Sequence, residues 1–180
     1  MHTQIKKRTL IQLDQDLLKL VQRMRNFKWD AVMVFVTSLG DAGFVWIAIG
    51  VVMSFKQKAR KTVMALFTSL ISGLAIGNLY LKNLVARPRP FSMEDSKALL
   101  IATPSDWSFP SGHTLAGFEV ATVLYRYNKL LGIATYALAS LIAYSRMYLN
   151  LHYPSDVLYA ALLGLGISTL VYKIMFKDDM

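Results

Sequence analysis

The stretch SRMYLNLHYPSD, residues 145–156, sets an arginine, a histidine and an aspartate at fixed offsets just before an apolar run. A carboxylate such as Asp156 can accept a hydrogen bond from one ring nitrogen of His152, which fixes the tautomer and leaves the other nitrogen free to attack. Arg146 carries a planar cationic group that suits phosphate oxygens. Pro154 fits the first turn of a helix, so Asp156 is expected in that turn, where negative charge is favoured. The stretch predicts nucleophilic chemistry on an anion, although an arginine and a histidine beside a membrane segment also fit an interfacial anchor.

Two further clusters favour the chemical interpretation. Residues 82–90 read KNLVARPRP, in which Lys82 precedes Arg89 by seven positions, and residues 110–113 read PSGH and open another apolar run. The three cations Lys82, Arg89 and Arg146 have no obvious carboxylate partners nearby in the sequence. We therefore expect them to bind an anion.

The start of the helix after PSGH supplies further donors for such an anion. The first turn of a helix has unpaired backbone N–H groups, and Gly112 would let a ligand approach them closely. Ser111 can add a hydroxyl donor. With the cations, these groups predict a preorganised cradle for a phosphoryl group.

In chain order, the patterns KxxxxxxRP, PSGH and SRxxxxxHxxxD resemble the three-part signature of the type 2 phosphatidic acid phosphatase (PAP2) family. That family comprises membrane lipid phosphatases and shares its site with vanadate-dependent haloperoxidases. The match covers about the second half of the chain, and every position named in the three patterns is present. The resemblance implies an all-α, integral-membrane helical bundle with a core like that of these two groups of enzymes.

The resemblance also implies a division of labour between two histidines. His152, oriented by Asp156, would attack phosphorus in line and form a phosphohistidine. His113 would protonate the departing oxygen and then activate the water that releases inorganic phosphate. The phosphate-binding residues would be Lys82, Arg89, Ser111, Gly112 and Arg146. Because three cations surround the phosphate, no metal and no cofactor is expected.

Some residues near the motifs are given other roles. Arg87 lies outside the family pattern and is interpreted as a headgroup contact. Tyr148 is interpreted as an aromatic anchor at the membrane interface. Glu119, a carboxyl within an apolar run, is given a structural role, either paired within the bundle with a residue such as Asn78 or protonated.

Composition supports a membrane protein independently of the motifs. The 180 residues suit a single domain, and 54% of them are apolar, which is too many for an ordinary soluble domain. With no cysteine, disulfides, thiolate metal sites and cysteine nucleophiles are excluded. The net charge of +9 comes mostly from short clusters between apolar runs, which fits membrane topology and phosphate binding better than nucleic acid. The polar first nine residues indicate no cleavable signal peptide.

The elements that must position the site are apolar spans. Residues 1–180 are expected to form one phosphatase domain, with an amphipathic interfacial helix in 1–29 and a transmembrane bundle in 30–176. The expected five spans cover residues 31–55, 63–81, 110–125, 130–144 and 154–172. The first is interrupted at Gly40–Gly43, which predicts a weak point or a surface turn.

Alternation of the spans places all the motif residues at one membrane face. The basic turns at 56–61, 126–129 and 173–177 fall at the other face, which the positive-inside rule makes cytoplasmic. We therefore expect a multi-pass plasma-membrane protein whose site faces the extracytoplasmic side. The basic N-terminus conflicts with this rule, so the amphipathic helix lies on the outer leaflet or Gly40–Gly43 forms a re-entrant fold. We favour the outer helix.

The leading functional hypothesis is a lipid phosphatase acting on undecaprenyl diphosphate, phosphatidylglycerophosphate or phosphatidic acid. A short loop at 92–107 in place of a lid domain slightly favours the polyprenyl diphosphate. Five spans argue against a vanadate haloperoxidase, and the intact His113, His152 and Asp156 argue against a non-catalytic lipid-phosphate binding or transport protein. The expected partners are the lipid substrate and the bilayer, with no nucleic acid and no obligatory protein partner.

Overall fold

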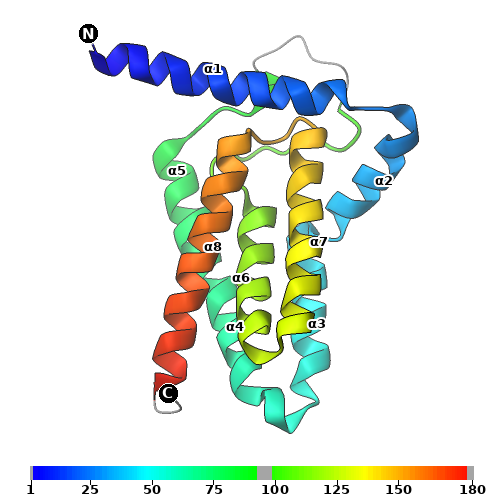
Figure 1. Ribbon diagram of the computed structural model, residues 1–180, viewed down its shortest axis with the longest axis vertical. Helices are drawn as coiled ribbons and strands as arrows, with labels where there is room; N and C mark the ends of the chain where they lie inside the picture. The colour runs from blue at the N-terminus through cyan, green and yellow to red at the C-terminus, as the bar shows by residue number, and fades with distance from the viewer. Residues whose placement is uncertain (1, 93–98, 178–180) are drawn as a thin grey trace.

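Helices form all the regular structure in residues 2–92 and 99–177, the part of the chain that the computed structural model describes. Figure 1 shows an upright bundle with one helix lying across its upper end. The helices are α1 (His2–Arg23), α2 (Phe27–Ser38), α3 (Phe44–Ser54), α4 (Arg60–Gly73), α5 (Lys82–Val85), α6 (Gly112–Tyr127), α7 (Lys129–Tyr148) and α8 (Pro154–Met175). A π-helical segment, Leu74–Leu81, joins α4 to α5, and short 3-10 helices lie at Asp41–Gly43, Gln57–Ala59 and Pro90–Ser92. The expectation of an all-α fold is confirmed.

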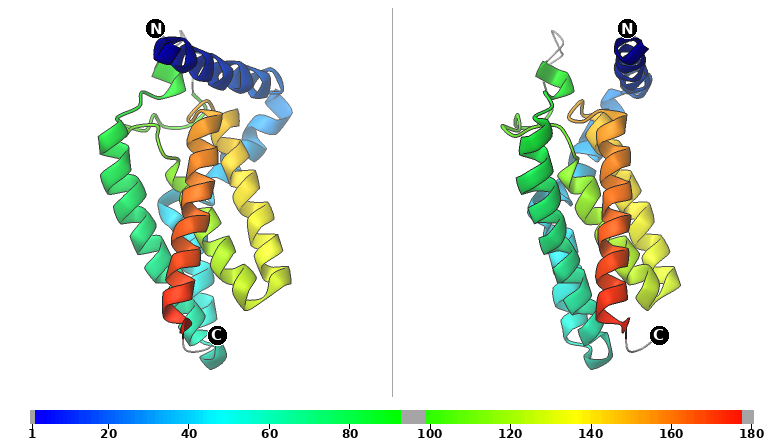
Figure 2. Two further views of the ribbon diagram at one scale, coloured as in Figure 1. Left: turned by 60° about the vertical axis from the view of Figure 1, so that its left-hand side comes forward. Right: turned by 90° about the vertical axis from the view of Figure 1, so that its left-hand side faces the viewer.

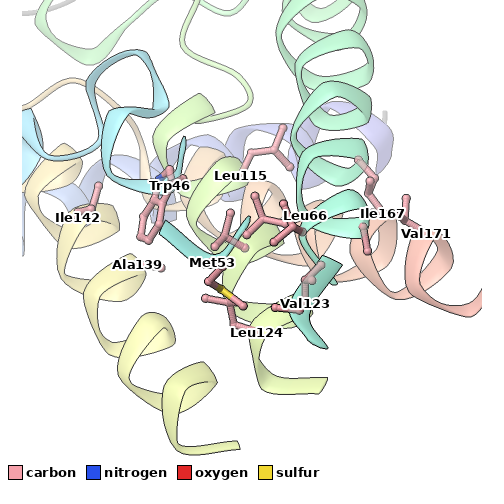
Figure 3. Close-up of a cluster of buried hydrophobic side chains, with 14 of the residues drawn as sticks. Trp46, Met53, Leu66, Leu115, Val123, Leu124, Ala139, Ile142, Ile167 and Val171 are labelled. Carbon is pink, nitrogen blue, oxygen red and sulfur yellow. The ribbon is translucent and has the colours of Figure 1, made fainter. Parts of the chain in front are cut away.

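The bundle packs around α6, although this helix has only 16 residues. It lies between α7 and α8 and also contacts α4 (Figure 1). Figure 3 shows Leu115, Val123 and Leu124 of α6 within one buried cluster together with Trp46 of α3 and Leu66 of α4. Burial of such side chains stabilises the fold by about 25 cal/mol per Å² of apolar surface. Because α6 is packed on several sides, its first turn is held in a fixed place relative to the other helices.

The outer faces of the long helices are apolar too. Large exposed side chains include Phe44, Phe55, Leu130, Leu170 and Ile174. Within the described residues, three helical segments are long and apolar enough to cross a membrane: Gln57–Ser92, α7 and α8. The bent pair of α2 and the following Asp41–Ser54 helix qualifies as a fourth if it counts as one span. The remaining expected span, 110–125, corresponds to α6, which has only 16 residues, too few for this test, and occupies the centre of the bundle.

The span expected at residues 31–55 is a broken helix. Ala42 and Gly43 have φ angles of 50° and 71°, a left-handed conformation that glycine adopts without strain. The two halves meet at 46°. The pair runs from the upper end to the lower end in Figure 1, so the chain crosses the bundle once here and does not turn back. The interruption inferred from the sequence is present, and the re-entrant alternative is not.

The N-terminal helix α1 is attached to the end of the bundle at which α7 ends and α8 begins (Figures 1 and 2). The side-chain nitrogen of Gln22 donates to the carbonyls of Met147 at 2.6 Å and Tyr148 at 3.0 Å. The phenol of Tyr148 accepts from the N–H of Asn26 at 2.9 Å and donates to Asp30 at 2.9 Å. Tyr148 is therefore buried beneath the N-terminal segment, and its interpretation as an interfacial anchor was wrong.

Candidate active site

The three motifs meet around one cavity of about 840 Å³, at the end of the bundle where α1 is attached. The cavity is lined by six of the residues singled out in the sequence: Lys82, Arg89, Gly112, His113, Arg146 and His152. Ser111 and Asp156, also singled out, are fully buried behind this lining. Segments that are far apart in the chain therefore supply one site, as the alternation of the spans predicted.

His152 lies in the link between α7 and α8, with its imidazole almost fully buried. Its Nδ1 is 2.7 Å from the backbone carbonyl of Ser108, which can only accept, so Nδ1 carries the proton. Nε2 keeps its lone pair and lies 3.2 Å from a guanidinium nitrogen of Arg89. Burial lowers the pKa of His152 to about 3, although the charge of Asp156 opposes this shift. The imidazole is therefore neutral at physiological pH, as a nucleophile must be.

Asp156 does not hold His152 by a direct hydrogen bond, which corrects the expected geometry. Its carboxylate is 3.8 Å from Nδ1. It accepts instead from the N–H of Tyr153 at 2.9 Å, from the hydroxyl of Ser108 and from Arg87 at 2.6 Å. Asp156 fixes Ser108, whose carbonyl then orients the histidine, so the support is indirect.

Arg87 is part of this support and is not a headgroup contact. Its guanidinium bridges Asp156 and Asp14, at 2.6 Å and 2.5 Å, and stacks over the ring of Tyr153 at 3.9 Å from the ring centroid. Local spacing could not indicate this pairing, because Asp14 is 73 positions from Arg87.

The cations of the site have a carboxylate partner that the sequence analysis missed. Asp106 accepts from Lys82 and from Arg89, the second at 2.6 Å. Partial burial alone would raise the pKa of Asp106, but hydrogen bonds and charge from the two cations outweigh burial and lower that pKa to about 2. Asp106 belongs to the 92–107 loop, of which residues 93–98 lie outside the described residues. The site thus holds an internal anion at the position expected to bind phosphate.

Arg146 contributes the third buried cation from the last turn of α7. One terminal nitrogen donates to the hydroxyl of Thr37 at 2.6 Å. Its Nε is buried and has no hydrogen-bond partner among the described residues. A buried donor of this kind is costly when it is unpaired, which fits a group that binds a ligand.

His113 in the first turn of α6 is oriented by the break in the first span. Its Nε2 is 3.0 Å from a carboxylate oxygen of Asp41, which follows Gly40 at the break. A Cβ at Gly40 would lie 2.6 Å from the His113 ring, so only glycine lets the chain pass this closely. Asp41 was interpreted from the sequence as part of a turn, and its role as a partner of His113 was missed.

The PSGH donors differ in their surroundings. The Ser111 hydroxyl accepts from Thr114 at 3.0 Å behind the cavity wall, and its role as a phosphate donor stays a prediction. Gly112 lines the cavity, but a Cβ there would lie 2.8 Å from the side chain of Asn78. The absence of a side chain at Gly112 therefore serves close packing of two helices as well as access to the N–H groups.

The deeper half of the cavity is mostly apolar. It is lined by Ile47, Phe67, Leu70, Ile71, Leu74 and Leu115, from α3, α4, the π-helical segment and α6. Glu119 closes it next to Gly73, where a Cβ would lie 2.1 Å from the carboxyl. One carboxyl oxygen of Glu119 and the side-chain oxygen of Asn78 each lack a hydrogen-bond partner within the described part of the chain, so the suggested Glu119–Asn78 pair does not form.

This arrangement offers the parts needed for phosphoryl transfer: a neutral buried histidine, a second histidine beside a carboxylate, and three buried cations. A charged headgroup at the polar end would leave an apolar tail to occupy the deeper half. The geometry fits an amphiphilic phosphate better than a small polar one.

Comparison with known proteins agrees with this chemistry. A family model described as the PAP2 superfamily matches residues 62–180. An undecaprenyl-diphosphatase of Sulfolobus acidocaldarius is 32% identical over 160 residues, covering 88% of this chain and 77% of the relative.

Two solved structures share the fold. LpxE from Aquifex aeolicus superposes with a TM-score of 0.80 at 29% identity, covering 89% of this chain and 95% of that one. A PAP2-type phosphatidylglycerolphosphate phosphatase from Bacillus subtilis gives a TM-score of 0.79 at 26% identity, covering 94% and 87%. With the apolar helices and the site described above, these matches establish that the chain belongs to the PAP2 superfamily and is a multi-pass membrane lipid phosphatase.

Proposed function

We propose that this phosphatase hydrolyses a polyprenyl diphosphate of the undecaprenyl diphosphate type and releases inorganic phosphate. The observation that carries the proposal is the division of one cavity into a cationic end with two histidines and an apolar end between the helices. A diphosphate would lie among Lys82, Arg89 and Arg146, with its chain extending toward Glu119 and the lipid. The undecaprenyl-diphosphatase relative supports this substrate class.

In the proposed first step, Nε2 of His152 attacks the terminal phosphorus. An N–P bond forms and the bond from that phosphorus to the bridging oxygen breaks. His113 gives its proton to the departing oxygen, so the lipid monophosphate leaves without an extra negative charge. Donors from the cations and from the first turn of α6 stabilise the charge on the transferring phosphoryl group.

In the second step, water attacks the phosphohistidine. His113, now neutral, takes a proton from this water, the N–P bond breaks and inorganic phosphate is released. Arg89 would turn from Nε2 of His152 to a phosphate oxygen when substrate enters, which frees the lone pair for attack. Asp106 must give up its contacts with Lys82 and Arg89 at the same time.

The proposed location is the plasma membrane, with the site on the extracytoplasmic side. The α3–α4 turn, the α6–α7 turn and the C-terminal end of α8 all lie at the end opposite α1 (Figure 1), and each of these short segments between or after apolar helices carries lysine or arginine. The positive-inside rule favours a cytoplasmic position for such turns. We also treat residues 1–180 as one functional domain, because α1 is bonded to the same end as the site.

Phosphatidylglycerophosphate is the second candidate substrate, because one structural neighbour is a phosphatase for it. The test is phosphate release in detergent from undecaprenyl diphosphate, phosphatidylglycerophosphate and phosphatidic acid. We expect the highest kcat/KM for the diphosphate and inhibition of every reaction by vanadate. A higher kcat/KM for phosphatidylglycerophosphate would favour the second candidate, and no phosphate release from any of the three would contradict both.

A further inference from the structure

Asp14 is a buried carboxylate on α1, a helix on which most of the side chains from residue 11 to residue 23 are exposed. On α1, Asp14 and Leu18 face the bundle, whereas Ile11, Leu13 and Leu17 are exposed. A buried charge is unfavourable unless it is paired and hydrogen-bonded. The partners of Asp14 therefore indicate what this residue does.

Those partners belong to the catalytic end of the bundle. One carboxylate oxygen of Asp14 accepts from the backbone N–H of Ser155 at 2.9 Å. The other accepts from the Ser155 hydroxyl and from Arg87, both at 2.5 Å. Ser155 is the second residue of α8, where the backbone N–H has no partner within the helix. Asp14 thus caps α8 from a different helix, with a charge that favours a helix N-terminus.

The same contacts lead directly to the residues behind the nucleophile. Arg87 connects the two aspartates: one of its terminal nitrogens binds Asp14 and the other lies 2.6 Å from Asp156. Asp156 holds Ser108, whose carbonyl is 2.7 Å from Nδ1 of His152. A continuous chain of hydrogen bonds therefore connects α1 with the imidazole.

We propose that Asp14 is a positioning residue for the phosphatase reaction: it caps α8 and fixes Arg87 against Asp156, so that attachment of α1 keeps His152 aligned. The inference rests on the proposed role of His152 as nucleophile. This positioning role differs from simple attachment of α1 to the bundle. Gln22, further along α1, provides such attachment by donating to the carbonyls of Met147 and Tyr148.

The test compares Asp14→Ala and Asp14→Asn with two control variants of α1. Gln22→Ala removes the other attachment without touching the hydrogen-bond chain, and Asp16→Asn removes an exposed charge two residues away. The full-length protein in detergent is assayed with farnesyl diphosphate, with thermal unfolding measured on the same samples. A displacement of about 1 Å in a reacting group can cost on the order of 100-fold in rate, so we expect kcat of Asp14→Ala to fall by roughly 10- to 100-fold.

The effect on KM distinguishes positioning of the nucleophile from weakened substrate binding. Because Lys82, Arg89 and Arg146 are not altered, KM should stay as in the parent protein, with the loss confined to kcat. Asp14→Asn keeps an acceptor but not the charge and should lie between Ala and the parent. Arg87→Gln should lower kcat as well, and adding Asp14→Ala to it should cost little more, because both residues act through one chain.

Parent-like kcat in a folded Asp14→Ala variant would overturn the inference. So would a loss no larger than that of Gln22→Ala, or losses that simply add in the double variant. If Asp14→Ala does not fold, the same criteria apply to Asp14→Asn. Acid-quench trapping of a phosphoenzyme in the parent, absent in His152→Ala, tests the proposed mechanism separately from the role of Asp14.

Discussion

At the scale of single residues, the site works through partners that come from distant parts of the chain. The backbone carbonyl of Ser108 sets the tautomer of His152, and Asp41 faces His113. Asp106 forms ion pairs with Lys82 and Arg89. The carbonyl of Ser108 leaves Nε2 of His152 with its lone pair, Asp41 offers a negative partner to a protonated His113, and Asp106 neutralises cations that an incoming anion would have to take over.

The first prediction separates the two histidines by their chemistry. His152→Ala removes the atom that bonds to phosphorus, so neither a lipid diphosphate nor an activated aryl phosphate should react. His113→Ala leaves the nucleophile in place and removes general acid catalysis, which is typically worth about 100- to 10,000-fold. That loss should shrink with the aryl phosphate, because its leaving group needs no proton. The measurement is single-turnover phosphate release from both substrates.

Trapping of phosphohistidine by acid quench provides the control for this comparison. His113→Ala should still form the phosphoenzyme, and His152→Ala should form none. Rescue of His152→Ala by the aryl phosphate, or a trapped phosphoenzyme in that variant, would reverse the assignment of the two roles.

The second prediction concerns Asp106 as an internal competitor of phosphate. Asp106→Asn removes the carboxylate that pairs with Lys82 and Arg89 but keeps the shape of the side chain. Inorganic phosphate and vanadate should then bind more tightly, with Ki lowered by about 10-fold, the equivalent of about 1.4 kcal/mol. Product release should slow for the same reason, so kcat should fall.

The matched control is Asp16→Asn, which removes one negative charge from the exposed face of α1. Its Ki for vanadate should equal that of the parent protein. An unchanged Ki in Asp106→Asn would mean that Asp106 does not compete with the anion.

At the scale of elements, the break between α2 and α3 belongs to the site. It places Asp41 at the cavity and brings the backbone of Gly40 against the ring of His113. The short α6 begins at the same place and carries His113 in its first turn. The position of His113, the proposed general acid, therefore depends on how these two elements meet.

The third prediction tests this contact with Gly40→Ala. The added Cβ would lie 2.6 Å from the His113 ring and 3.2 Å from the side chain of Ile142, so the imidazole must move away from Asp41. We expect kcat with a lipid diphosphate to fall by about 10- to 100-fold, because small displacements of catalytic groups are costly. The aryl phosphate should be affected less, since it depends less on His113.

Gly166→Ala is the control, because a Cβ at this position of α8 meets nothing within 4 Å. Alanine is favoured over glycine in a helix by about 1 kcal/mol, so this variant should unfold at the same or a higher temperature with full activity. Equal activity of Gly40→Ala and Gly166→Ala would show that the contact with His113 is unimportant.

The sequence predicted what is encoded in local spacing. His152, His113, Lys82, Arg89 and Arg146 were singled out because fixed offsets within three short motifs carry them, and the family resemblance together with the apolar runs supplied the all-α class. The break at Gly40 was visible from composition. These features depend on neighbours in the chain, which a sequence shows directly.

The missed features depend on contacts between distant segments. Asp41 lies 72 positions from His113, Ser108 lies 44 positions from His152 and Asp14 lies 141 positions from Ser155. Nothing in spacing or composition distinguishes Asp106 from another loop carboxylate. Tyr148 was misinterpreted for the same reason. An aromatic residue at a helix end resembles an interfacial anchor, and only its contacts with the distant residues Asn26 and Asp30 show that it is covered.

At the scale of the whole molecule, the two ends of the bundle differ: one carries the proposed catalytic site and the other carries the basic turns. α1, the 99–111 segment and the α7–α8 link gather at the catalytic end, and the basic turns gather at the opposite end (Figures 1 and 2). The apolar half of the cavity lies between them among α3, α4 and α6. A lipid substrate could therefore keep its tail among the helices while its headgroup reaches the cations.

The last prediction concerns the orientation of the bundle in the membrane, that is, which of its two ends faces the cytoplasm. The chain contains no cysteine, so a single introduced cysteine reports its own side of the membrane. Lys28→Cys places a thiol at the start of α2 near the catalytic end, and Lys58→Cys places one in the basic turn before α4; both positions are exposed. With a membrane-impermeant maleimide on intact cells, we expect labelling of Lys28→Cys alone, and labelling of Lys58→Cys only after permeabilisation. The positive-inside rule counts basic turns such as the one at Lys58, which favours this orientation, although α1 brings its own lysines and arginines to the catalytic end. The reverse labelling pattern would place the site on the cytoplasmic side. The lysines and arginines of α1, and not those of the turns, would then follow the positive-inside rule.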